Sequence, residues 1–313
     1  MNKVALLIIG MALLLIQHSV AAIQQNAQYL FFITGIIFLG IPHGAADLLV
    51  ASRNADLFEK KFSKNRFFIF YIGRLVAFAF ILLLFPVFGN IIFILFAAYH
   101  FGETDLYQFK TNTLPGKIFV FSYGSLILSV ILLHHFDDVK LIYFMFESGK
   151  RNEVIINYIS DNRYYLLSAN AMIFFISSFI YFILNKYADN LEGGKFLIRF
   201  AVILFILFNL PLILGFTFYF IVWHSMISLN NIIIYLRQRN KVSYKTIVKQ
   251  ILLYSSVAIG GIAIFGLTGF MFINENAVVA YIFFGLAVLT APHAEIMYKM
   301  YVAIRSKSTD LLA

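Results

Sequence analysis

Four of the seven histidines in this chain of 313 residues occupy the same position along their apolar segments. Each lies 10 to 13 residues before a Lys or Arg that follows the segment (43 to 53, 100 to 110, 224 to 237 and 293 to 305). At 1.5 Å of rise per residue, all four imidazoles lie roughly 15–20 Å from that flank, near the middle of a bilayer. Ionisable side chains are costly there and usually face the interior of a helix bundle for a functional reason. The pattern therefore predicts a metal site formed by His43, His100, His224 and His293.

Carboxylates accompany these histidines and predict how the imidazoles are oriented. A ligating imidazole commonly donates its second N–H to a carboxylate, and Asp47 and Asp105 follow two of the histidines closely enough for that role. Which aspartate serves which histidine stays open, and Glu103 is a further acid in the same stretch. Glu295 is the weakest of these acids because its spacing turns it off the His293 face.

The chain contains no Cys, so any metal is held by imidazole and carboxylate. Imidazole suits Zn, Cu, Fe and Ni, and four imidazoles without thiolate favour Fe(II) with open positions for O₂ chemistry. A haem held by histidine pairs is the alternative cofactor. Haem pairs would favour two depths in the membrane, whereas these histidines share one.

The composition predicts the elements that position this site. With 61% hydrophobic and 12% charged residues, the chain is far more apolar than a soluble domain. Since ~20 apolar residues cross the hydrocarbon, we expect an all-α, polytopic membrane helix bundle of about ten transmembrane helices, forming a single integral domain over 1–313. The first span is also compatible with a signal peptide, and residues 137–163 form the one long outer loop. The predicted spans are 4–22, 28–50, 66–87, 90–109, 117–135, 163–185, 196–215, 217–236, 248–271 and 276–303.

The basic residues predict the orientation of these spans. Of the 24 Lys and Arg residues, the outer segments hold only Lys140, Lys150, Arg151 and Arg163, and Arg74 lies within a span, so 19 remain inside. This asymmetry follows the positive-inside rule and places both termini in the cytoplasm, in a cytoplasmic (inner) membrane. It also accounts for the net charge of +9 through the membrane surface rather than nucleic acid.

The residues around the four histidines suggest an apolar substrate. Pro42 and Pro292 each precede a histidine and free a backbone carbonyl one turn earlier, which opens the helix there. Aromatic residues make up 18% of the chain, and Tyr99, Tyr219 and Trp223 flank the predicted site. A metal at mid-membrane without a charged conduit indicates a long apolar molecule delivered from the lipid bilayer. Packing within the core is the alternative role of each aromatic side chain.

Four segments resemble, in order and context, the Brp/Blh family of bacterial and archaeal β-carotene 15,15′-dioxygenases. They are Gly-Ile-Pro-His43-Gly-Ala-Ala-Asp47, Tyr-His100-Phe-Gly-Glu-Thr-Asp105, Val-Trp-His224-Ser and Ala-Pro-His293, and the similarity runs from about residue 28 to 303. The resemblance implies a multi-helix membrane enzyme that binds Fe(II) through these histidines. It further implies that O₂ is used to split the central double bond of β-carotene into two all-trans-retinal, often for a microbial rhodopsin.

One position departs from that family pattern. Many members carry a second histidine one turn after the Trp-His-Ser motif, where this chain has Ser228. Either His293 completes the ligand set, or the chain is a divergent relative. A non-catalytic carotenoid or retinal binder, or a relative with another carotenoid substrate, is therefore the alternative function. A haem electron carrier and a transporter are further alternatives, although the paired broken helices of a transporter are not evident.

Overall fold

The computed structural model describes residues 2–20, 22–146, 151–185, 191–240, 242–269 and 278–310. These residues form helices and no strand, so the prediction of an all-α polytopic membrane protein is confirmed. Seven helical stretches among them are long and apolar enough to cross a membrane, rather than the ten that were predicted. They are 25–57, 64–84, 86–105, 114–134, 153–184, 212–237 and 280–305.

The three remaining predicted spans are also helical. The first forms a shorter apolar helix, and the other two correspond to helices of 19 and 26 residues over Leu191–Asn209 and Tyr244–Gly269. Residues 270–277, where the predicted spans 248–271 and 276–303 end and begin, lie outside the described residues, as do Lys150, Lys186 and Lys241. The predicted helix positions thus agree with the structure better than the predicted number of membrane crossings does.

The elements are, in chain order, α1 (Lys3–Leu15), η1 (Ile16–Val20), α2 (Gln25–Gly35), η2 (Ile36–Gly40), α3 (Ile41–Ala45), α4 (Asp47–Leu57), α5 (Lys64–Leu84), α6 (Pro86–Asp105), α7 (Leu114–Ser129), η3 (Val130–His134), α8 (Phe136–Phe144), α10 (Glu153–Leu184), α11 (Leu191–Asn209), α12 (Leu212–Phe216), η4 (Thr217–Ser225), α13 (Met226–Asn240), α14 (Tyr244–Gly269) and α15 (Val278–Asp310), where η denotes a π-helix.

The predicted outer loop over 137–163 is largely helical. The helix α8 covers its beginning, and α10 starts at Glu153 and continues for 32 residues. The polar side chains of this stretch pair with each other, since Arg163 Nη1 lies 2.7 Å from Asp137 Oδ1 and Lys140 Nζ donates to Asn157 Oδ1 at 2.7 Å. These pairs satisfy charged and polar side chains of the stretch, and its place outside the membrane stays a prediction.

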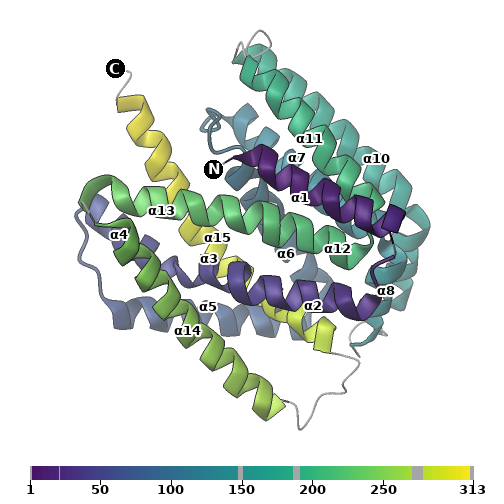
Figure 1. Ribbon diagram of the computed structural model, residues 1–313, viewed down its shortest axis with the longest axis horizontal. Helices are drawn as coiled ribbons and strands as arrows, with labels where there is room; N and C mark the ends of the chain where they lie inside the picture. The colour runs from purple at the N-terminus through teal and green to yellow at the C-terminus, as the bar shows by residue number, and fades with distance from the viewer. Residues whose placement is uncertain are drawn as a thin grey trace. The chain divides into compact units, whose positions relative to one another are not determined.

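The chain divides into two compact units. Unit 1 comprises residues 1–40, 101–140 and 155–227. Within it α1 packs against α11, as Figure 1 shows. Its core is strongly aromatic: the rings of Phe119 and Tyr181 stack at 4.6 Å, and Phe174 is fully buried beside them. Large aromatic side chains contribute a large share of apolar burial in such a core.

Unit 2 comprises residues 41–100, 141–154 and 228–313. The helix α14 packs against α3, and the long helix α15 packs against α4 and α5 (Figure 1). A small apolar cluster of Phe78, Leu82 and Ala287 joins α5 to α15. Arg74, the cation predicted inside a span, forms an ion pair with Glu295 of α15 at 2.7 Å. The unit therefore pairs the charges that its helices carry into the apolar region.

Four π-helical segments, η1 to η4, occur among the described residues, and all belong to unit 1. A π-helix closes its hydrogen bonds between residues five apart and is rare, usually occurring as a single turn near a functional site. The segment η4 has nine residues and contains His224. The segment η2 ends at Gly40, three residues before His43. Of the four predicted ligands, His224 thus lies in a widened turn and His43 lies shortly after one.

Candidate metal centre

Three of the four predicted histidines gather within unit 2. His43 lies on α3, His100 on α6 and His293 on α15, and each is buried. The ring centroid of His293 lies 4.9 Å from that of His43 and 4.9 Å from that of His100. His293 is therefore the centre of a compact group of three imidazoles, which we call the histidine cluster.

Asp47 is the carboxylate of the histidine cluster, and its partner is His293. The Nδ1 atom of His293 lies 2.8 Å from Asp47 Oδ1, and both side chains are buried. An ionised carboxylate only accepts hydrogen bonds, so Nδ1 of His293 carries the proton and donates. Among the described residues, Nε2 of His293 is buried without a hydrogen-bond partner. This is the arrangement of a ligating imidazole, with one nitrogen fixed by a carboxylate and the other available to a metal.

The local backbone explains why Asp47 does not serve the nearer His43. The helix α3 ends at Ala45 and α4 begins at Asp47, with a turn at Ala46 between them. This break removes the regular spacing by which residues four apart face the same side of a helix. Asp47 is thereby directed to the helix that carries His293.

Tyr71 of α5 is a functional neighbour that the sequence did not reveal. Its hydroxyl donates to Asp47 Oδ2 at 2.9 Å, so Asp47 accepts from Tyr71 on one oxygen and from His293 on the other. Both oxygens of the carboxylate are thereby held in place. Nothing in the sequence distinguishes Tyr71 among the 18 tyrosines of the chain.

The imidazoles of the histidine cluster meet edge to face. The ring of His293 lies at 81° to that of His43 and at 85° to that of His100. Within the part of the chain that the structure describes, no group of three or more His, Asp or Glu side chains is arranged to hold a metal ion. The cluster thus brings suitable ligands together, with their rings in contact rather than with three nitrogens around one point.

The two prolines have different effects on their helices. The π-helix η2 ends at Gly40 and a new helix starts at Ile41, so the backbone changes directly before Pro42. The helix α15, in contrast, continues through Pro292 for a total of 33 residues. The predicted opening of the helix therefore has a visible counterpart only at Pro42.

His224, the fourth predicted ligand, belongs to unit 1 and is fully buried in η4. Its ring lies 4.6 Å from that of Phe101 and is stacked 6.1 Å from that of Phe220. Ser228, where a second histidine is often expected, is also buried, and its hydroxyl has no hydrogen-bond partner among the described residues. The ligand role of His224 stays a prediction.

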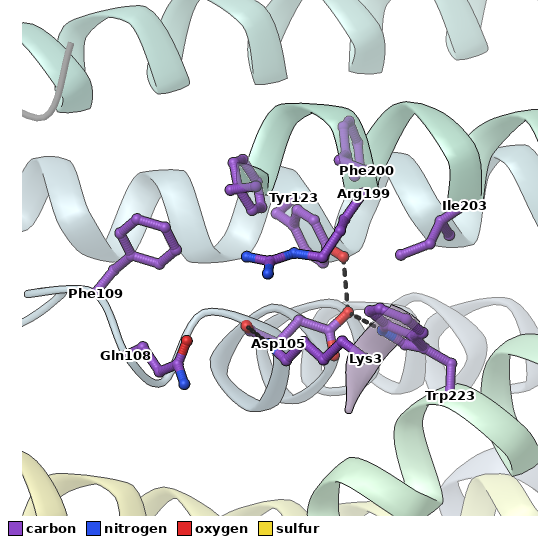
Figure 2. A pocket seen from close by; sticks show the side chains of 10 residues that line it. Lys3, Asp105, Gln108, Phe109, Tyr123, Arg199, Phe200, Ile203 and Trp223 are labelled. Carbon is purple, nitrogen blue, oxygen red and sulfur yellow. Dashed lines mark hydrogen bonds between the residues drawn. The ribbon is translucent and has the colours of Figure 1, made fainter. Parts of the chain in front are cut away.

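Asp105 belongs to unit 1, where its hydrogen-bond donors are two tyrosines and a tryptophan. Its Oδ2 atom accepts hydrogen bonds from the hydroxyls of Tyr123 and Tyr219, at 2.7 and 3.1 Å, and from Nε1 of Trp223 at 2.9 Å. Figure 2 shows Asp105 between Tyr123 and Trp223, in a small pocket that Lys3 and Arg199 also line. We call Asp105, Tyr123, Tyr219 and Trp223 the aspartate cluster.

The other predicted site residues have structural partners or lie elsewhere. Tyr99 contacts Tyr298, with ring centroids 6.1 Å apart, and its substrate role stays a prediction like those of Tyr219 and Trp223. Glu295 pairs with Lys299 as well as Arg74, as its weak sequence signal indicated. Glu103 is buried in unit 1.

The remaining three histidines lie together in unit 1. They are distant in sequence from His224, the predicted ligand of that unit. His18 and His134 donate through Nε2 to consecutive carbonyls near the end of α11, those of Asn209 at 2.8 Å and Phe208 at 3.1 Å. His135 is half-buried beside His134, with ring centroids 4.7 Å apart. These contacts give the three histidines structural roles.

Comparison with known proteins gives two matches and one absence. A model of the family described as "Beta-carotene 15,15'-dioxygenase" matches residues 34–301, a range that includes every predicted ligand. A curated protein of the same name, from the uncultured marine bacterium 66A03, is 24% identical over 265 residues, which cover 82% of this chain and 88% of the relative. No solved structure matches.

Proposed function

Because the chain belongs to the beta-carotene 15,15′-dioxygenase family, we propose that it is a membrane enzyme that cleaves the central double bond of β-carotene to give two molecules of all-trans-retinal. The observation that carries this proposal is the histidine cluster with its bound carboxylate. His43, His100, His293 and Asp47 all lie within the matched residues 34–301 and are all buried in one unit.

We propose that the cofactor is Fe(II), held by His43, His100 and His293. The donors fit this ion because imidazole is a good ligand for iron and the chain has no thiolate. The hydrogen bond from His293 Nδ1 to Asp47 fixes the tautomer in which Nε2 is the metal-binding atom. His224 is the proposed fourth ligand. Bound iron supplies the activation of O₂, which side chains alone do not provide.

The protein's own contribution in this proposal is to hold and orient the ligand side chains and to exclude water. Asp47 and Tyr71 keep the His293 imidazole in one orientation, while burial of the three histidines keeps bulk water from the cluster. A buried, preoriented site avoids the reorganisation that the same groups would need in water.

We propose that β-carotene reaches the site from the lipid bilayer. Seven apolar helical stretches make the chain a multi-pass membrane protein, and the substrate is itself a long hydrocarbon. The positive-inside pattern supports a cytoplasmic (inner) membrane with both termini in the cytoplasm. Tyr99, Tyr219 and Trp223 are the proposed aromatic contacts of the substrate, and a microbial rhodopsin is the proposed recipient of retinal.

Expression in cells that accumulate β-carotene tests this function directly. We expect retinal in extracts from the wild type and from His134→Ala, which removes a histidine outside the proposed ligand set. His100→Ala, present in the membrane at the same level, should leave β-carotene intact. Retinal from His100→Ala at the wild-type amount would contradict the ligand assignment, and its absence from the wild type would contradict the function.

A non-catalytic carotenoid or retinal binder is the second candidate, favoured by the buried Ser228 where a histidine is often expected. Such a protein would purify with carotenoid bound and yield no aldehyde. The absorption spectrum of the purified wild type, combined with analysis of extracted pigment, separates the two functions.

A further inference from the structure

The π-helix η4 requires tertiary contacts to hold it. It spans nine residues, Thr217–Ser225, whereas most π-helices are single turns within an α-helix. The chain continues as an α-helix on both sides, in α12 and α13. Contacts with other helices must therefore stabilise the wider form in this segment.

Asp105 makes the polar contacts that η4 needs. Its Oδ2 atom accepts from Tyr219 near the start of η4 and from Trp223 near its end. All three side chains are buried, with exposed fractions of 6%, 0% and 2% for Asp105, Tyr219 and Trp223. Leaving a buried polar group without its hydrogen-bond partner is costly, so these contacts hold the three side chains together. One carboxylate thus ties together most of the length of η4.

Phe101 provides a second contact from the same helix. It lies four residues before Asp105 on α6, and its ring centroid is 5.3 Å from Tyr219 and 4.6 Å from His224. The helix α6 therefore contacts η4 twice, through the carboxylate of Asp105 and, one turn earlier, through the ring of Phe101. His224 follows Trp223 directly, so the anchored residue and the proposed ligand are neighbours on one backbone.

We propose that Asp105 is a positioning residue that holds η4 in its π-helical form and so sets the direction in which His224 points. This inference rests on the proposed ligand role of His224. It assigns Tyr219 and Trp223 to the anchor, through their hydroxyl and N–H groups. If η4 shortened its turn by one residue, His224 would rotate by about 100° relative to the preceding helix, since each residue of an α-helix turns by that angle.

The single tryptophan of the chain makes the anchor measurable without metal or substrate. Trp223 is the one Trp in the sequence, so all tryptophan emission reports on the Asp105–Trp223 hydrogen bond and its surroundings. In metal-free protein we expect Asp105→Leu to raise acrylamide quenching of this emission severalfold and to lower its anisotropy. Asp105→Asn, which keeps a carbonyl acceptor, should lie between Asp105→Leu and the wild type.

Two tyrosines offer a matched pair of variants. Tyr219 and Tyr123 both donate to Oδ2 of Asp105 and both are buried, but only Tyr219 belongs to η4. Tyr219→Phe should therefore increase quenching of Trp223 more than Tyr123→Phe does. This pair also carries the test if Asp105→Leu fails to fold, because each variant removes a single oxygen atom.

Anaerobic Fe(II) titration tests the consequence for His224. We expect Asp105→Leu to weaken Fe(II) binding by about 10–100-fold, the usual effect of removing a group that orients a metal ligand. Tyr219→Phe should weaken it less, and Tyr123→Phe least. Asp105→Asn, which has the same shape and keeps one acceptor oxygen, should recover only part of the affinity, whereas a purely steric role of Asp105 would predict full recovery.

The outcomes separate the anchor from the proposed function. Unchanged quenching of Trp223 in Asp105→Leu overturns the anchor. Increased quenching with wild-type Fe(II) affinity overturns the positioning of His224. If the wild type binds no Fe(II) and forms no retinal, the proposed function and the positioning role fail, while the fluorescence comparison still decides whether Asp105 anchors η4.

Discussion

Asp47 in unit 2 and Asp105 in unit 1 are both buried aspartates with two or more hydrogen-bond donors, yet the donors differ in kind. Asp47 accepts from an imidazole and a tyrosine, one on each oxygen. Asp105 accepts from two tyrosines and a tryptophan, all on one oxygen. In our proposals, the first arrangement orients a metal ligand directly, and the second fixes the backbone segment that carries one.

The comparison shows that similar sequence motifs need not make similar sites. In each motif an aspartate follows a histidine within five residues, with a glycine directly or shortly after that histidine. In space, the two aspartates have different partners: Asp47 pairs with His293, 246 positions away, whereas Asp105 accepts from two tyrosines and a tryptophan. A carboxylate's role is thus defined by the donors that the fold brings to it.

Removing the imidazole held by Asp47 is the strongest way to test the contrast. We expect His293→Ala to abolish both Fe(II) binding and retinal formation, because His293 contacts both other members of the histidine cluster. Quenching of Trp223, which belongs to the aspartate cluster, should stay at the wild-type value. Fe(II) titration and fluorescence on the same preparation check both expectations, and retained iron binding would contradict the central role of His293.

The two motif glycines should differ strongly in their tolerance of a methyl group. A Cβ on Gly102 in unit 1 would overlap the backbone carbonyl of Val120, whereas a Cβ on Gly44 in unit 2 would meet no atom within 4 Å. Gly102→Ala should therefore lower stability by about 3 kcal/mol, at the upper end for overpacking. Gly44→Ala should change stability by less than about 0.5 kcal/mol.

Thermal unfolding of both variants in the same detergent measures this difference. Equal midpoints for Gly102→Ala and the wild type would show that α6 and α7 can separate at no cost, which would contradict their close approach. The wild-type sequence itself is the reference for each variant.

The sequence predicts a common depth for the histidines because depth depends only on helical rise and flanking charges, and that depth stays a prediction. It could not assign Asp47 to His293, because that contact depends on the break at Ala46 and on a helix near the far end of the chain. It also missed η4, since the expected periodicity of 3.6 residues does not reveal a π-helix. Tyr71 and Tyr123 were missed for a related reason, because an isolated tyrosine carries no signal. The contacts of Tyr219 and Trp223 with Asp105 were not predicted either, since they depend on which helices lie adjacent.

Neutralising Asp47 tests the same comparison with a smaller expected effect on Fe(II) affinity. Asp47→Asn keeps an acceptor for His293 but removes the charge that raises the basicity of its imidazole, so we expect Fe(II) affinity to fall by about 10–100-fold. Tyr71→Phe removes one hydrogen bond from the same carboxylate and should cost about 1 kcal/mol of binding free energy. Tyr123→Phe, the corresponding change at Asp105, is the control. An equal loss of affinity for the Tyr71 and Tyr123 variants would remove the distinction between the two carboxylates.

The smallest expected effect concerns pH and is confined to unit 1. Burial lowers the pKa of His135 below its ordinary value of 6.5, and the neighbouring His134 lowers it further. A folded-state pKa below the unfolded value means that the unfolded chain binds more protons in this range, so stability falls as pH decreases. The contribution of His135 is thus fully present above pH 6.5 and is lost as the pH falls toward and through the folded-state pKa.

His135→Gln should flatten the dependence of the unfolding midpoint on pH between about 8 and about 5, with a small change because the side chain is partly exposed. His18→Gln, which removes another histidine of unit 1, one that donates to the end of α11, is the control. A pH dependence that survives His135→Gln unchanged would place the titrating group elsewhere.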